Sequence, residues 1–264
     1  MTFAIIGNGA IAQYVLRRLS ERGHHVAAQI LRPARLEAMG EADQASPLRI
    51  ATHADMPAHV RHVIDCAGHS GLSEHGPGLL QAGYDLTTLS LGALADQALF
   101  DALDIAAKAG GARLHLASGA IGALDCLSSA RIGALESVTY IGRKPPMGWA
   151  GSPAEAVVDL AAMGDAPVTH FEGTARVAAR QYPKNANVAA AVALAGIGFD
   201  ATKVALIADP TVTQNIHEVE ATGDFGRFTF RIEGNSLPDN PRSSALAAMS
   251  AVHTAERALA AIVL

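Results

Sequence analysis

Hydrophobic residues in the first 118 positions form short apolar runs separated by segments with helical spacing. Such runs, bounded by glycine, proline or polar residues, predict buried strands at 3–6, 26–31, 48–50, 63–67, 84–89 and 113–117. Between them, Ile11, Val15 and Leu19 recur at helical spacing, and a further helix is predicted over 95–109. Alternating strands and helices predict a doubly wound parallel sheet, whose strands are covered on both faces.

The pattern changes after residue 118. It predicts a strand at 137–141, helices at 153–160 and 187–195, and strands at 204–208, 215–221 and 228–232. Successive strands favour an antiparallel or mixed sheet in a second α/β domain over 119–235. The last segment, 236–264, is expected to end in an alanine-rich amphipathic helix that docks back on the first domain. The apolar face of that helix is predicted to carry Leu246, Met249, Val252, Leu259 and Ile262.

A glycine pattern marks the first strand-to-helix turn. Residues 7–12, GNGAIA, follow a strand and open a helix, as a G-x-G-x-x-G/A dinucleotide fingerprint requires. Gly7 permits the tight turn, and Gly9 has no Cβ to obstruct a pyrophosphate. The N–H groups at the start of the helix then face the phosphates. We therefore expect a Rossmann domain over 1–118 that binds NAD or NADP through Gly7, Gly9, Ala10 and Ile11.

Arg32 follows the second predicted strand, where an NAD-specific site usually carries Asp or Glu for the ribose 2′-hydroxyl. An arginine cannot accept that hydrogen bond, but it can bind a 2′-phosphate. A solvated loop arginine is the alternative. The sequence therefore predicts that NADP is tolerated and NAD is not excluded.

Composition narrows the class of protein further. The 264 residues include 20 basic and 25 acidic side chains, for a net charge of −5, and half are hydrophobic. The high hydrophobic content excludes a disordered chain, and the net negative charge argues against nucleic-acid or anionic-membrane binding. The chain shows no signal peptide and no apolar stretch long enough to cross a bilayer. Two cysteines and no metal-ligand pattern predict a cytoplasmic protein without a metal site.

Small residues also follow three later strands, at 66–69, 90–94 and 118–122. The nicotinamide is expected near such strand ends, and Ala67 belongs to the first of these loops. Glycines that merely end strands are the alternative. Among eleven histidines, His217 stands out, because strand alternation places it on one face with Asn215 and Val219. An unperturbed imidazole, with a pKa of about 6.5, suits proton transfer there; His69 is the second candidate.

Several segments carry a more specific pattern: 90–96, 118–125, 143–146, 182–190, 208–210, 215–217 and 240–244. Together they resemble the L-aspartate dehydrogenase family almost end to end. The resemblance implies NAD(P)-dependent oxidative deamination of L-aspartate, linked to NAD biosynthesis. It also implies that His217 is the active-site histidine and that Ala120 and Asn187 contact the cofactor. Asp65, Gly68 and Arg242 depart from the family's commoner residues.

A substrate with two carboxylates needs cations or backbone donors in its site. The candidates are Lys184, Arg143, Lys144, Arg242 and the hydroxyls of Ser243 and Ser244. Lys144 and Lys184 lie in prolyl turns, where solvated lysines are the alternative. A homodimer is also expected. Two other functions stay open: another NAD(P)-dependent dehydrogenase on the same scaffold, and a non-catalytic NAD(P)H-sensing module.

Overall fold

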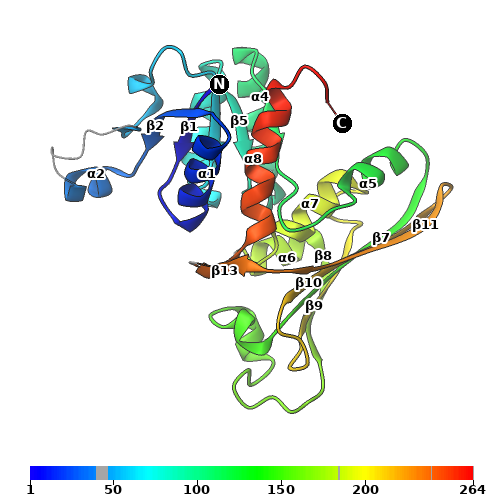
Figure 1. Ribbon diagram of the computed structural model, residues 1–264. Helices are drawn as coiled ribbons and strands as arrows, with labels where there is room; N and C mark the ends of the chain where they lie inside the picture. The colour runs from blue at the N-terminus through cyan, green and yellow to red at the C-terminus, as the bar shows by residue number, and fades with distance from the viewer. Residues whose placement is uncertain (40–46, 184, 239, 264) are drawn as a thin grey trace. The chain divides into compact units, whose positions relative to one another are not determined.

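The computed structural model describes residues 1–39, 47–183, 185–238 and 240–263. It divides into two compact units (Figure 1): residues 1–117 with 248–264, and residues 118–247. The first division lies next to the boundary expected at residue 118. Residues 236–247, which the sequence analysis grouped with the terminal helix, belong to the second unit.

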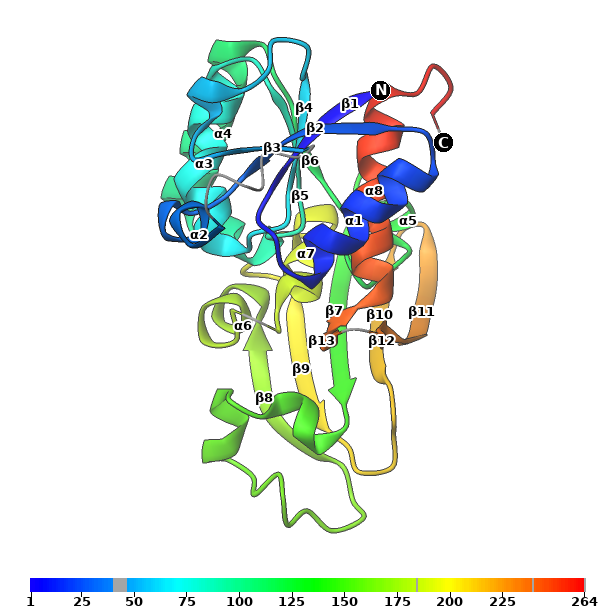
Figure 2. The ribbon, with the colours of Figure 1, turned by 60° about the vertical axis from the view of Figure 1, so that its left-hand side comes forward.

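The first unit contains a six-stranded sheet in the order β3-β2-β1-β4-β5-β6. All of its strand pairs are parallel (Figure 2). The order reverses between β1 and β4, which makes the carboxyl ends of these strands the place where such sheets bind ligands. The doubly wound fold is confirmed. The strands are β1 Thr2–Ile6, β2 His25–Ile30, β3 Leu48–Ile50, β4 His62–Asp65, β5 Asp85–Thr88 and β6 Leu114–Leu116.

Four helices follow strands of this sheet: α1 Ala10–Glu21, α2 Pro33–Met39, α3 His69–Gln81 and α4 Gln97–Gly110. Helix α4 shows why these boundaries form. Asp96 accepts a hydrogen bond from the backbone N–H of Ala98 at its start, and Gly111 adopts φ +64° at its end. A left-handed residue at that position closes a helix, and glycine adopts it without strain.

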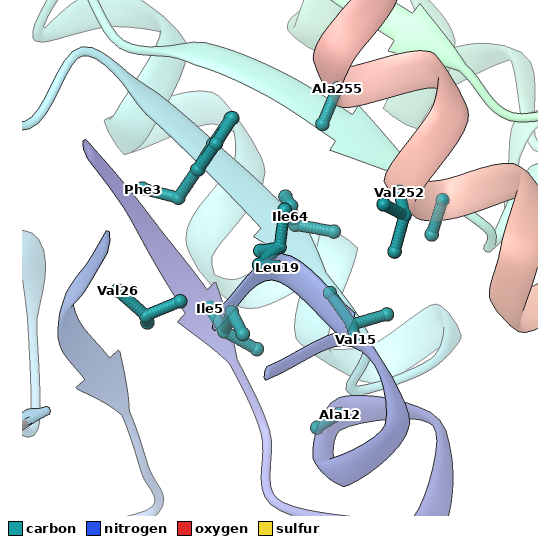
Figure 3. Packing of buried hydrophobic residues seen from close by; sticks show 10 residues of the cluster. Phe3, Ile5, Ala12, Val15, Leu19, Val26, Ile64, Val252 and Ala255 are labelled. Atoms are coloured by element: carbon teal, nitrogen blue, oxygen red, sulfur yellow. The ribbon is translucent and has the colours of Figure 1, made fainter. Parts of the chain in front are cut away.

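The C-terminal helix α8, Ala245–Leu259, completes the core of the first unit. In the buried hydrophobic cluster of this unit, Val252 and Ala255 of α8 are directed towards Leu19 and Ile64 (Figure 3). The buried face is lined mainly by small residues, so the helix lies close to its neighbours. The predicted apolar face was wrong at two positions, because Met249 is 45% exposed and Ile262 is 93% exposed.

The second unit contains a mixed five-stranded sheet in the order β11-β10-β7-β9-β8. Strands β7 and β9 are parallel, and the other pairs are antiparallel. The strands are β7 Leu135–Lys144, β8 Val168–Thr174, β9 Lys203–Ala208, β10 Asn215–Gly223 and β11 Gly226–Gly234. Helices α5 Leu124–Ala130, α6 Ala175–Gln181 and α7 Asn187–Ala195 complete it, with the short pair β12 Ser236–Leu237 and β13 Asn240–Ser244.

Several predicted elements differ from the structure. The helix expected over 153–160 is a single 3₁₀ turn, Pro153–Ala156. The terminal helix begins at Ala245 rather than 243, because β13 occupies the preceding residues. Helix α3 has three glycines and Pro77 in its interior, a composition that conceals a helix from sequence patterns. Within the described residues, no helix combines the length and apolar character needed to cross a membrane.

Candidate active site

A pocket of about 670 Å³ lies beside the glycine turn of the first unit, and Gly7, Gly9, Arg32 and Ala67 line it. Gly7 adopts φ +94°, and a Cβ there would lie 3.2 Å from the Ala67 Cβ and from the Cys66 carbonyl oxygen. Both conformation and space therefore require glycine at this position. A Cβ on Gly9 would meet nothing within 4 Å, so the backbone there faces open space.

These residues fit a dinucleotide. Gly9 caps helix α1, and the first turn, which contains Ala10 and Ile11, has no acidic residue to repel a phosphate. Arg32 and Arg35 line the same pocket after β2, and Arg32 is exposed. Their positive charge suits a ribose 2′-phosphate and leaves the 2′-hydroxyl without the usual carboxylate partner.

A buried carboxylate supports the loop that carries Ala67. Asp65 is fully buried, and its Oδ1 accepts a hydrogen bond from the Ala67 backbone N–H at 2.9 Å. Its Oδ2 accepts from the hydroxyls of Thr88 at 2.7 Å and Ser90 at 2.9 Å. Burial raises the pKa of Asp65, and these hydrogen bonds counteract the rise. The carboxylate thus ties the ends of β4 and β5 together beneath the pocket.

In the second unit, His217 lies on β10 opposite Gly142 of β7, and only 5% of it is exposed. Its Nδ1 is hydrogen-bonded to the Tyr140 hydroxyl at 2.8 Å, and the two rings are stacked with centroids 6.1 Å apart. Burial, together with the charge of Lys144, lowers the pKa of His217 to about 4. The expectation of an unperturbed imidazole was wrong, because strand β10 carries this ring into the interior of the unit.

Lys144 ends β7 on the same face as Tyr140 and Gly142, since side chains alternate along a strand. Its Nζ donates to Asn185 Oδ1 at 2.8 Å and lies 4.6 Å from the centroid of the Trp149 ring. Burial lowers the pKa of Lys144 to about 8. The Lys144 amine is therefore largely withdrawn from solvent, and the alternative interpretation as a solvated turn lysine is wrong.

An aromatic cluster lies beside this lysine. Trp149 is 1% exposed and donates from its indole N–H to the Ile207 carbonyl at 2.9 Å. The His170 ring packs edge-on against Trp149 at 4.5 Å, and its Nδ1 is hydrogen-bonded to the Tyr182 hydroxyl at 3.2 Å. Burial and the charge of Lys144 lower the pKa of His170 to about 4. These contacts fix the Trp149 ring against which the Lys144 amine packs.

The other predicted substrate-binding residues that the structure describes have partners of their own. Arg143 points to the opposite face of β7 by strand alternation, and its guanidinium forms an ion pair with Asp209 at 2.6 Å. Ser243 lies in β13, where its hydroxyl accepts from Asn240 Nδ2 at 3.1 Å. Lys184 and the side chain of Arg242 lie outside what the structure describes.

The second unit also holds the two cofactor contacts implied by the resemblance. Ala120 is 7% exposed in the loop before α5, and Asn187 is the first residue of α7. His69, the alternative acid–base candidate, begins α3 in the first unit.

Sequence reasoning missed Tyr140, Asn185 and Trp149, the direct partners of His217 and Lys144. The polar positions of 215–217 identified β10, but its pairing with β7 was needed to find Tyr140. The fold also groups His62, Asp85 and His115, whose potential metal-ligating atoms lie within 4.8 Å of one another. No sequence spacing shows this cluster, because the three residues lie on three different strands, β4, β5 and β6. His62 Nε2 is hydrogen-bonded to Thr87 at 2.7 Å, and His115 Nε2 lies 3.3 Å from an Asp85 oxygen.

Models of known protein families match the sequences of both units. Residues 125–258 match the family model described as aspartate dehydrogenase, C-terminal. Residues 7–117 match the model described as homoserine dehydrogenase, NAD binding domain. The crystal structure of an aspartate dehydrogenase from Thermotoga maritima is similar, with a TM-score of 0.73, 26% identity, and 100% of this chain and 99% of that chain covered.

Curated relatives are closer in sequence. An L-aspartate dehydrogenase of Ruegeria pomeroyi is 54% identical, covering 94% of this chain and 88% of that protein. An L-aspartate dehydrogenase of Ralstonia pickettii is 44% identical, with 94% of each chain covered. With its matching C-terminal model and these near full-length relatives, this chain belongs to the L-aspartate dehydrogenase family.

Proposed function

We propose that this protein oxidises L-aspartate with NAD⁺ or NADP⁺ to iminosuccinate, which water hydrolyses to oxaloacetate and ammonia. The observation that carries the proposal is the buried group of Tyr140, His217 and Lys144. It lies in a chain that is 54% identical to an L-aspartate dehydrogenase over 94% of its length. The first unit holds the cofactor in this proposal, and the second supplies the groups that act on the substrate.

The chemistry of the substrate explains why such groups are needed. Aspartate carries an ammonium group that must lose a proton before Cα can be oxidised. It also carries two carboxylates, which bind to charged or neutral hydrogen-bond donors. The nicotinamide, when bound, accepts the hydride from Cα. In this proposal Lys144 and His217 each offer a side-chain nitrogen to the substrate. Lys184 and Ser243 are candidate ligands of its carboxylates.

The pocket of the first unit supports the use of either cofactor. The exposed Arg32 offers a guanidinium to a 2′-phosphate, and the glycine turn serves the pyrophosphate that NAD and NADP share. We therefore propose that NADP⁺ is accepted along with NAD⁺, with Gly7, Gly9, Ala10, Ile11 and Ala67 in the cofactor site.

We further propose that the protein works as a cytoplasmic homodimer that supplies NAD biosynthesis. The family resemblance supports this place in metabolism, and two free cysteines suit a reducing compartment. Light scattering on the purified protein tests the dimer: twice the 27.2 kDa chain mass is expected. A single chain mass at micromolar concentration contradicts it.

A substrate panel tests the reaction itself. The protein is incubated at alkaline pH with NAD⁺ or NADP⁺ and a set of amino acids, hydroxy acids and semialdehydes, and reduced-cofactor absorbance is followed. We expect L-aspartate to give the highest kcat/KM. Preference for a hydroxy acid or semialdehyde favours another dehydrogenase on this scaffold. Tight cofactor binding with no turnover of any compound favours a sensing module.

A further inference from the structure

Tyr140 and Gly142 determine how His217 is held. Gly142 lies opposite His217 in the β7–β10 pairing, and Tyr140 lies two residues earlier on the same face of β7. A Cβ on Gly142 would lie 2.7 Å from the Tyr140 hydroxyl oxygen. The phenol therefore crosses the bare glycine, and this path lets its hydroxyl reach His217 Nδ1 at 2.8 Å.

The burial of Tyr140 sets the direction of this hydrogen bond. Tyr140 is 1% exposed, and buried donors are almost always paired. Among the described residues, the hydrogen-bond partner of its hydroxyl is His217 Nδ1. The O–H therefore donates, and Nδ1 accepts through its lone pair. A neutral imidazole that accepts at Nδ1 carries its proton on Nε2, so a ligand at Nε2 meets an N–H rather than a lone pair.

The neighbouring lysine has the complementary property. Lys144 lies two residues beyond Gly142 on the same face of β7, and its Nζ donates to Asn185 Oδ1. Because burial lowers the pKa of Lys144 to about 8, an uncharged amine is well populated at mildly alkaline pH. Burial and the lysine charge also keep His217 neutral, with its pKa near 4. Of the two nitrogens, Lys144 Nζ is the one with a lone pair for a proton.

We propose, resting on the function proposed above, that Lys144 is the base for the substrate ammonium and that His217 is a neutral hydrogen-bond donor. Tyr140 is the positioning residue that fixes the Nε2–H form of His217. One N–H bond of the ammonium breaks, and the proton forms a new bond to Lys144 Nζ. The electron pair stays on the substrate nitrogen and becomes the second bond of the C=N group when Cα is oxidised. Lys144 then releases the proton to water, while His217 donates to a substrate carboxylate oxygen and transfers no proton.

Two variants of His217 separate a donor from a base. Glutamine keeps an N–H near the position of Nε2 but has no basic nitrogen. We expect His217→Gln to turn over aspartate at least about tenfold faster than His217→Ala, the effect of one hydrogen bond to a charged group. Equal losses in the two variants overturn the donor role.

The pH profile identifies the base. In the wild type, kcat/KM for aspartate is expected to fall below pH about 8 as Lys144 becomes protonated. This limb persists in His217→Gln. It is lost in Lys144→Met, whose turnover is about 10²–10⁴-fold lower. A limb that disappears in His217→Gln and persists in Lys144→Met overturns the assignment.

A spectroscopic test is independent of turnover. In full-length protein with ¹⁵N-labelled histidine, without cofactor or substrate at pH 7, we expect His217 to be protonated at Nε2 and bare at Nδ1. Tyr140→Phe and Gly142→Ala should both disturb this state. Gly173→Ala is the matched control, because its Cβ meets the Phe171 ring at 2.9 Å in the same sheet. A proton on Nδ1 in the wild type, or equal effects of all three variants, overturns the role of Tyr140. Failure to oxidise aspartate with the Nε2–H form present rejects the proposed reaction and leaves the positioning intact.

Discussion

At the scale of single residues, burial gives His217 its chemical character. The ring is 5% exposed and its pKa is lowered to about 4, so it is uncharged throughout the physiological range. An exposed histidine would lose most of its hydrogen-bonding advantage to competing water. In the interior, one well-placed N–H is stronger, because the local dielectric is low.

Removal of the ring should therefore affect turnover far more than cofactor binding. We expect His217→Ala to lower kcat with aspartate by about 10²–10³-fold, the loss typical of removing a preorganised hydrogen-bond donor from an active site. The Kd for NADH, measured by fluorescence titration, should stay within about twofold, because the dinucleotide pocket lies in the other unit. Unchanged turnover removes His217 from the mechanism.

Arg32 should decide how well NADP competes with NAD. Replacing its guanidinium with a carboxylate, in Arg32→Asp, removes a charged donor for the 2′-phosphate and supplies an acceptor for the 2′-hydroxyl. We expect kcat/KM for NADP⁺ to fall by about 10- to 100-fold, while the value for NAD⁺ is kept or rises.

The control for this change is Arg17→Asp, which alters net charge equally at an exposed residue of α1. Its cofactor preference should match that of the wild type. An equal loss of NADP⁺ activity in both variants would mean that overall charge, and not contact with Arg32, sets the preference.

At the scale of whole elements, the close packing of α8 makes one of its faces intolerant of change. Ala255 is fully buried, whereas His253 lies two residues earlier on the exposed face. We expect Ala255→Asp to lower the free energy of unfolding by at least about 2 kcal/mol, because it buries a carboxylate without a partner. His253→Asp, on the same helix, should change it by less than about 0.5 kcal/mol. Urea unfolding compares the two, and equal effects would show that α8 is only loosely docked.

Elements with a strong local signal were predictable from the sequence. The apolar runs of β1 and β2 and the glycine turn after β1 identified the parallel sheet, because buried strands and tight turns produce local sequence patterns. Helix α3 gave no such pattern, since its interior contains three glycines and a proline. The partners of His217 could not be predicted from the sequence either. Tyr140 and His217 are 77 residues apart, and strand register, a property of the folded sheet, brings them together.

At the scale of the whole molecule, buried histidines in both units should make the fold sensitive to acid. Burial lowers the pKa of His62, His170 and His217 to about 4. An unfolded histidine has a pKa of about 6.5, so between these values the unfolded chain binds more protons than the folded one. The free energy of unfolding should therefore fall as pH drops from about 6.5 towards 4, by on the order of 1–3 kcal/mol per histidine.

Denaturant unfolding at pH 7, 6 and 5 measures this slope. His170→Gln removes one of the three titrating rings and should flatten the slope, whereas the exposed His253→Gln should not. Stability that stays constant across this range in the wild type contradicts neutral burial of these rings.

The return of α8 to the first unit has a consequence for synthesis of the chain. Residues 1–117 leave the ribosome well before Ala251, Val252 and Ala255, which complete their core but are translated only after the second unit. Until α8 is translated, the apolar surface around Phe3, Ile5 and Leu19 stays exposed on the nascent chain, and we expect a chaperone to bind it. A deletion that removes residues 251–255 would thus damage a unit whose sheet is translated much earlier.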